Sequence, residues 1–202
     1  MANYPGAKFV QVEHERISEL ADYVLHVHDL EDVVAATVAL GDSLRDGQPL
    51  PNTGNTLWTG AVLTYARCFD GARFHRLNAH EVYSSEAQEM HQEFWNLRSK
   101  HYAHDVNDHR QVSVGAALSN EGTVLDVVWL ASAVAHWRRR VPELLWLADT
   151  ALSFARHRQQ KLAEQIAASV EQYSPADRLS LPTMVKPAVA KLNIQASRRN
   201  QT

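Results

Sequence analysis

The chain contains 202 residues, of which 45% are hydrophobic and 21% charged, and its formal net charge is −3. This composition fits one folded globular domain, and it excludes a disordered or fibrous protein and a molecule whose whole surface attracts nucleic acid. The single cysteine, Cys68, excludes intrachain disulfides and thiolate zinc sites. No stretch has the pattern of a signal peptide or the apolar length of a membrane span, so we expect a cytoplasmic protein without membrane contact.

Helical spacing dominates the first hundred residues. Apolar residues recur every three or four positions over 12–40, which predicts a helix pair or one bent helix. Glycine, proline and asparagine crowd 41–55 and predict a loop. A second helix is expected from Thr56, which can cap it, to Gly71, and a third from about Ser84.

The period changes from 3.6 to 2 at 111–129, where apolar residues alternate with small or polar ones. Asn120, Glu121 and Gly122 supply turn chemistry, and the residues after them are rich in β-branched side chains. We therefore predict one antiparallel β-hairpin inserted among helices. A lone hairpin is only marginally stable, so this one must pack on a helix or pair with another copy.

A long helix is expected from Pro142, in its first turn, to Tyr173. Prolines after this helix interrupt regular structure, and the end of the chain is basic. The sequence thus predicts a mainly α protein, with one antiparallel helical bundle over residues 1–175 and a basic, partly ordered tail at 176–202.

Histidine is unusually frequent, because eleven histidines occur in the chain and six of them lie between His75 and His109. The densest run is 98–109, with the sequence RSKHYAHDVNDH. One interpretation is a polar helix end that faces water. Another is a zinc or manganese site, because spacings of three and four place ligands on one side of a helix. The ligands would be His101, His104, Asp105, Asp108 and His109.

A third interpretation of the same run is a nuclease site. Arg98 would hold and neutralise a phosphate, while His104 would transfer a proton at neutral pH. If the RNA supplies its own 2′-hydroxyl as the nucleophile, attack on the adjacent phosphate forms a cyclic phosphate and needs no metal ion. His101 offers a second acid or base.

The segment 97–104 resembles the signature of the HEPN (higher eukaryotes and prokaryotes nucleotide-binding) superfamily, which is an arginine, four to six residues and then a histidine. Five residues separate the two in this chain. The upstream pieces YARCF at 65–69 and EMH at 89–91 are similar to the helices that precede the motif in HEPN-like bacterial proteins. The resemblance therefore covers about 56–109.

The resemblance implies a helical bundle that commonly dimerises and brings two Arg-and-His motifs to a shared cleft, where RNA is cut without a metal ion or other cofactor. It implies Arg98 and His104 as the catalytic residues, with Ser99, His101 and His91 in support. The partners to expect are RNA or a nucleotide, a second copy of the chain and, in a toxin–antitoxin or phage-defence setting, an antitoxin protein.

Two alternatives remain open. Ser99 departs from the Asn, Asp or His that typically follows the arginine in active ribonucleases of the superfamily. This departure allows a catalytically inactive nucleotide-binding or protein-interaction module of the same fold. The other alternative is a metal-dependent hydrolase built on the His and Asp run at 101–109.

Overall fold

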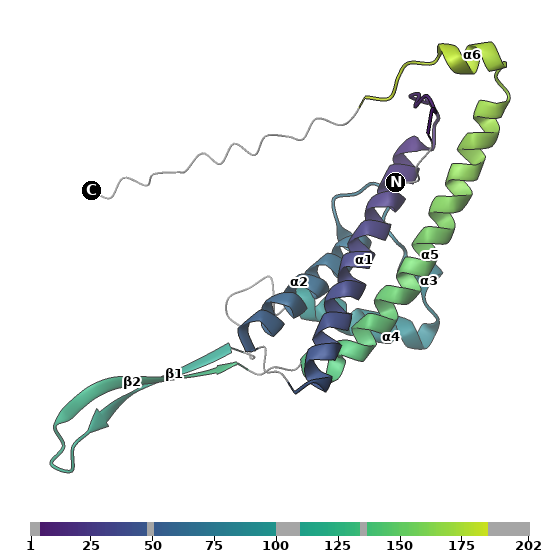
Figure 1. Ribbon diagram of the computed structural model, residues 1–202. Helices are drawn as coiled ribbons and strands as arrows, with labels where there is room; N and C mark the ends of the chain where they lie inside the picture. Colours follow the sequence, from purple (N-terminus) through teal and green to yellow (C-terminus); the bar gives the residue numbers. More distant parts are fainter. Residues whose placement is uncertain (1–4, 48–50, 100–109, 134–136, 186–202) are drawn as a thin grey trace, which may run out of the picture.

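The computed structural model describes residues 5–47, 51–99, 110–133 and 137–185. As predicted, it is mainly helical, with one antiparallel two-stranded hairpin. Figure 1 shows α1 and α5 running side by side, with α2, α3 and α4 against them. In chain order the elements are α1 (Ile17–Arg45), α2 (Pro51–Asp70), α3 (Ala79–Val82), α4 (Ser85–Leu97), β1 (Arg110–Leu118), β2 (Val124–Ala133), α5 (Trp137–Glu171) and α6 (Pro175–Ser180).

The long helices α1 and α5 are antiparallel and share the most extensive helix–helix contact of the described residues. Arg156 of α5 donates a hydrogen bond to Glu31 of α1 at 2.8 Å, across the exposed edge of the pair. Small side chains on α5 let the two helix axes approach closely. The buried residues of α1 recur every three or four positions, the spacing typical of helices paired along their length. They are Tyr23, His26, Asp29, Leu30, Val33, Thr37 and Leu40.

The helix α4 is anchored by one aromatic side chain. Phe94 is fully buried, and its ring centroid lies 5.9 Å from that of Trp58 and 6.4 Å from that of Tyr65, both on α2. Edge-to-face contacts of this kind add to the stabilisation from burial. The helix that leads to Arg98 is therefore held on the core by its own last turn.

The connection between α1 and α2 is shorter than the predicted loop at 41–55. α1 continues through Gly41 as one helix, and α2 begins at Pro51, so Thr56 lies inside α2 and does not cap it. Gly41 packs on α5, where an added Cβ would lie 3.9 Å from Cγ1 of Val141. Glycine costs a helix about 1 kcal/mol, and the burial of Leu40 and the packing of Leu44 on the core offset this cost.

α5 also differs from its expected start, because Pro142 lies inside the helix and not in its first turn. An interior proline costs about 3 kcal/mol, since its ring clashes with the preceding turn and one hydrogen bond is lost. Trp137 and Val141, just before it, are both buried in the core. Burying two such side chains stabilises by roughly 1.5–3 kcal/mol each, which offsets the cost of the proline.

After α5 the chain turns back toward its beginning. Ser174 caps α6, and its hydroxyl oxygen accepts a hydrogen bond from the backbone N–H of Asp177 at 3.2 Å. An isolated antiparallel bridge then pairs Thr183 with Val10. The described start of the predicted tail at 176–202 is thus bonded to the N-terminal segment. None of the described helices has the length and apolar content that a membrane span requires.

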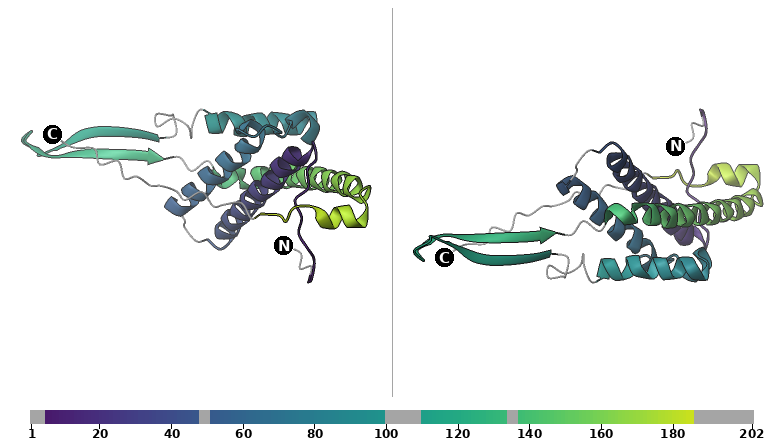
Figure 2. Two further views of the ribbon diagram at one scale, coloured as in Figure 1. Left: turned by 90° about the horizontal axis from the view of Figure 1, so that it is seen from above. Right: turned by 90° about the horizontal axis from the view of Figure 1, so that it is seen from below.

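The hairpin forms where the alternating pattern predicted it, at the expected range of 111–129. Its turn is closed by the backbone N–H of Ser119, which donates to the Thr123 carbonyl at 2.8 Å, and Gly122 supplies the required positive φ of +83°. A bulge between Ala117 and Leu118 shifts the register near the turn. Figures 1 and 2 show the hairpin extending away from the helices.

Candidate functional site

Arg98 lies at the end of α4, and its backbone N–H still donates to the carbonyl oxygens of Phe94 and Trp95. Its side chain is 38% exposed, with Nη1 3.7 Å from a carboxylate oxygen of Asp70 at the end of α2. Its Cζ lies 5.8 Å from the centroid of the Trp95 ring. These contacts orient the cation and leave part of it open to solvent.

Asp70 is shared between two arginines. Nη1 of Arg76 lies 3.5 Å from the other oxygen of the same carboxylate. The two guanidinium groups share this carboxylate at the C-terminal ends of α2 and α4. Exposed ion pairs of this kind stabilise by about 0–1 kcal/mol, so a phosphate group can compete with Asp70 for Arg98.

Beneath this surface, a chain of hydrogen bonds links four elements. The Tyr83 hydroxyl donates to the Leu147 carbonyl of α5 at 2.9 Å. Because a hydroxyl has one proton, the 3.0 Å contact between Tyr83 and Tyr65 requires Tyr65 to be the donor. The 2.7 Å contact between Tyr65 and His91 then requires Nδ1 of His91 to donate. The chain therefore fixes the His91 tautomer, with the proton on Nδ1.

His91 is buried, with 7% of the residue exposed, and burial lowers its pKa to about 4. The ring is therefore neutral at pH 7, and Nε2 keeps its lone pair. Nε2 has no hydrogen-bond partner in the part of the chain that the structure describes. The ring of Trp95 lies 6.2 Å from His91, between it and Arg98 along α4. The core sets the tautomer and the position of His91, and its supporting role in the site stays a prediction.

Of the other residues predicted for the site, Ser99 belongs to the part of the chain that the structure describes, and His101 and His104 do not. Ser99 follows Arg98 directly and is half-buried. His101 and His104 lie outside the described residues, as does the whole of the predicted metal run at 101–109. The structure thus brings Arg98 and Ser99 together, and the pairing of Arg98 with His104 stays a prediction. Within the described ranges, no group of three or more His, Cys, Asp or Glu residues could hold a metal ion.

Sequence reasoning missed Asp70 and Trp95 as neighbours of Arg98. A signal for Asp70 was present, because a carboxylate at the C-terminal end of a helix opposes the helix dipole and needs a nearby cation. Gly71 marks that helix end in the sequence. Trp95 follows the apolar stripe of α4, and nothing local distinguishes a ring that supports an arginine from one that fills the core.

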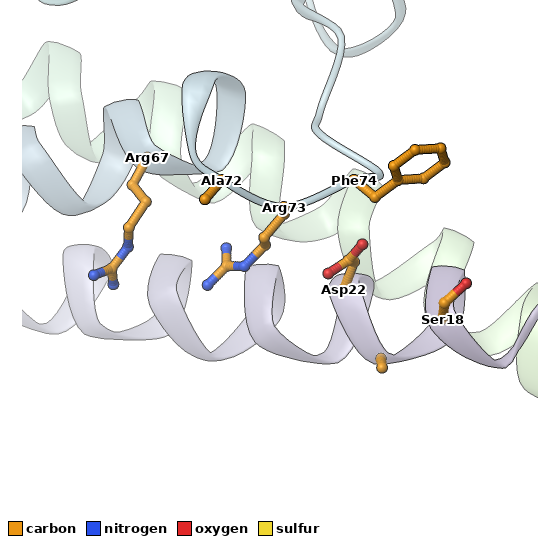
Figure 3. Close-up of a pocket in the computed structure, with 7 residues that line it drawn as sticks. Ser18, Asp22, Arg67, Ala72, Arg73 and Phe74 are labelled. Carbon is orange, nitrogen blue, oxygen red and sulfur yellow. The ribbon is translucent and has the colours of Figure 1, made fainter.

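A second cluster of charges joins α2 and the loop after it to α1. Asp29 is buried and accepts hydrogen bonds from Arg67 at 2.7 Å and from Arg73 at 2.5 Å. Arg73 also donates to Nδ1 of His26 at 2.9 Å, so the opposite nitrogen of His26 donates to the His75 carbonyl at 2.8 Å. Figure 3 shows Arg67 and Arg73 reaching from their backbone toward α1.

These arginines line a surface pocket with a volume of about 580 Å³. Its charged groups are already matched, because Asp29 holds both arginines and Asp22 accepts from the backbone N–H of His75 at 3.0 Å. The cluster therefore has a structural role, in which its ion pairs join α1 to α2 and to the loop after α2. The lining residues are Ser18, Ala21, Asp22, Arg67, Ala72, Arg73 and Phe74.

Asp29→Asn tests this structural role, because it removes the charge and keeps one oxygen. We expect the free energy of unfolding in urea to fall by about 2 kcal/mol, since the largely buried Arg73 loses its counter-charge. Asp32→Asn is the matched control on the exposed side of α1, where Asp32 faces His28, and should change stability by less than about 0.5 kcal/mol. Equal effects of the two substitutions would contradict the role given to Asp29.

No family profile, curated protein or solved structure matches this chain. Its own residues define it as a mainly helical protein with an extended hairpin and a partly exposed arginine at the end of α4.

Proposed function

We propose that the protein is a metal-independent endoribonuclease of the HEPN type, with Arg98 and His104 as its catalytic residues. The observation that carries the proposal is the placement of Arg98, which α4, Asp70 and Trp95 hold at the surface with part of its guanidinium open. A planar cation fixed in this way suits a phosphate group, which it can contact through two N–H groups at once.

In the proposed reaction, the 2′-hydroxyl of RNA attacks the adjacent phosphorus. A neutral histidine accepts the 2′ proton, and an acid delivers a proton to the 5′-oxygen as the bond from phosphorus to that oxygen breaks. His104 and His101 supply these two roles. Arg98 stabilises the negative charge that develops on the phosphate oxygens, and Ser99 adds a hydroxyl donor next to it. The products carry a 2′,3′-cyclic phosphate and a 5′-hydroxyl, and no cofactor is consumed.

The resemblance to HEPN proteins also sets the proposed biological context. The active form would be a homodimer in which two motifs face a shared cleft. A toxin or a phage-defence component fits this activity, with cytoplasmic RNA as substrate and an antitoxin protein as partner.

One alternative is supported by a specific contact. Arg98 is 3.7 Å from Asp70, so the cation is already partly neutralised within the chain. Together with Ser99 in place of the usual Asn, Asp or His, this pairing favours a catalytically inactive module that binds nucleotides or a protein. The metal-dependent hydrolase built on 101–109 is the third candidate, and it differs from the other two in its sensitivity to chelators.

The test is cleavage of mixed-sequence RNA by the purified full chain in the presence of EDTA. We expect wild type to cut and to leave 2′,3′-cyclic phosphate ends, and Arg98→Ala and His104→Ala to cut at least about 10²-fold more slowly in preparations of equal purity. RNA binding without cleavage would favour the inactive module. Cleavage that EDTA abolishes would favour the metal-dependent hydrolase, and cleavage that survives both substitutions would point to a contaminant.

A further inference from the structure

One face of the β-hairpin carries large apolar side chains that no other described element covers. The strand register places Val114, Ala116 and Leu118 of β1 on the same face as Val124 and Val127 of β2. The four larger residues are 55–69% exposed. Figures 1 and 2 show that the helices lie to one end of the hairpin and leave its length free. We call these five residues the apolar hairpin face.

The opposite face of the hairpin has a different character. Ser113, Gly115 and Ala117 of β1 lie there with Asp126 and Val128 of β2. Four of these five residues are small or polar, so the hairpin is amphipathic. Because a two-stranded hairpin is barely stable in water without a covering partner, its apolar side is typical of a surface that binds another molecule.

The chemistry of the apolar hairpin face favours a second copy of the chain. None of its five residues is charged, so it offers no counter-charge to RNA phosphates or to a charged protein surface. Its side chains alternate in size along β1, from Val114 to Ala116 to Leu118. In a two-fold arrangement, the small residue of one copy can receive a larger side chain of the other. The face is thus complementary to itself.

The area of the face is also sufficient for a reversible dimer. The five residues, with Leu125 at the bulge, expose on the order of 600 Å² per protomer. If a dimer buried all of this surface, two copies would remove on the order of 1,000 Å² from water in total, which is the lower limit for a specific interface. We therefore expect a dimer whose population depends on protein concentration.

We propose that the apolar hairpin face packs against the same face of a second copy of this chain, so that two hairpins form a small two-layered sandwich. β1 begins soon after Arg98 in the chain, so such a dimer would join the two copies close in sequence to both proposed nuclease motifs. The hairpin contact is then the one that holds the two copies together, and it does not depend on whether the protein cleaves RNA.

Sedimentation velocity of the full chain over a range of micromolar concentrations tests the proposal. We expect wild type to shift from monomer to dimer with concentration, and Val127→Asp to remain monomeric throughout. The matched control is Val128→Asp, because Val128 is the next residue, is 44% exposed and lies on the opposite face. This control should dimerise as wild type does. A monomeric wild type, or loss of the dimer in both variants, would overturn the proposal.

A second measurement covers the case in which Val127→Asp unfolds the hairpin. Ala116→Cys, on the apolar hairpin face, should be cross-linked between two copies by a short bis-maleimide reagent, which can span offset thiols. Gly115→Cys, on the opposite face, should not, and the space there admits its Cβ, which would lie 4.0 Å from Val128. Cys68 is buried and does not interfere. Equal cross-linking at both positions would overturn the proposal, and this readout is independent of RNA cleavage.

Discussion

Arg98→Ala is expected to slow RNA cleavage by about 10²- to 10³-fold, the usual effect of removing one preorganised group that stabilises transition-state charge. The free energy of unfolding should change by less than about 0.5 kcal/mol, because the Arg98 side chain is partly exposed and its ion pair with Asp70 lies at the surface. Single-turnover cleavage of a labelled RNA measures the first quantity, and urea unfolding measures the second.

Arg76→Ala is the matched control for this prediction. Arg76 shares the Asp70 carboxylate but lies outside the proposed motif, so its loss should alter the rate by no more than about fivefold through long-range attraction. Arg98→Lys should give an intermediate rate, since lysine keeps the positive charge but lacks the planar guanidinium group that lies beside Trp95. Equal losses of activity at positions 76 and 98 would mean that Arg98 acts only through bulk charge.

Acidification from pH 7 to pH 4 is expected to lower the free energy of unfolding by about 3 kcal/mol through His91 alone. Burial reduces the pKa of His91 from 6.5 to about 4, so the unfolded chain binds a proton more readily than the folded one in this window. The stability that neutral His91 contributes is complete above pH 6.5 and is lost as pH falls from 6.5 toward 4. Urea unfolding at a series of pH values measures the loss.

The contribution of His91 is isolated by comparison with His91→Phe. In that variant Tyr65 still donates to Tyr83, so no buried donor is left without an acceptor. Its pH profile should be flatter than that of wild type by about 3 kcal/mol over the same window. Carboxylates and His26, whose pKa burial also lowers, contribute equally to both profiles. Parallel profiles for the two proteins would show that His91 is not buried in its neutral form.

Local periodicity was enough to predict the kinds of elements in this fold. The change from helical to alternating spacing located the hairpin, and Gly71 marked the end of α2. The ends of the helices were harder to predict, because glycine and proline both have a low propensity for the interior of a helix and therefore suggested ends near Gly41 and Pro142. Each stays within a helix because residues distant in sequence pack beside it or its neighbours, and a local pattern carries no information on such contacts.

The same limit applies to the candidate site. The motif predicts Arg98 from a few neighbouring residues, and the structure places it at the end of a helix with its charge at the surface. Asp70 and Tyr65 come from another helix, so their proximity follows from how α2 and α4 pack. The burial of His91 has the same origin. A separation of seven residues along a helix puts His91 on the same face as Arg98, and only packing decides that it lies below the surface.

The hydrogen-bond chain under α4 gives a distant residue control over the polarity of His91. If Tyr83 lost its hydroxyl, Tyr65 would turn its proton to Nδ1 of His91, the nearest remaining acceptor. The imidazole proton would then move to Nε2, and the edge that now accepts a hydrogen bond would donate one. The hydroxyl oxygen of Tyr83 thus determines whether Nε2 of His91 accepts a hydrogen bond or donates one.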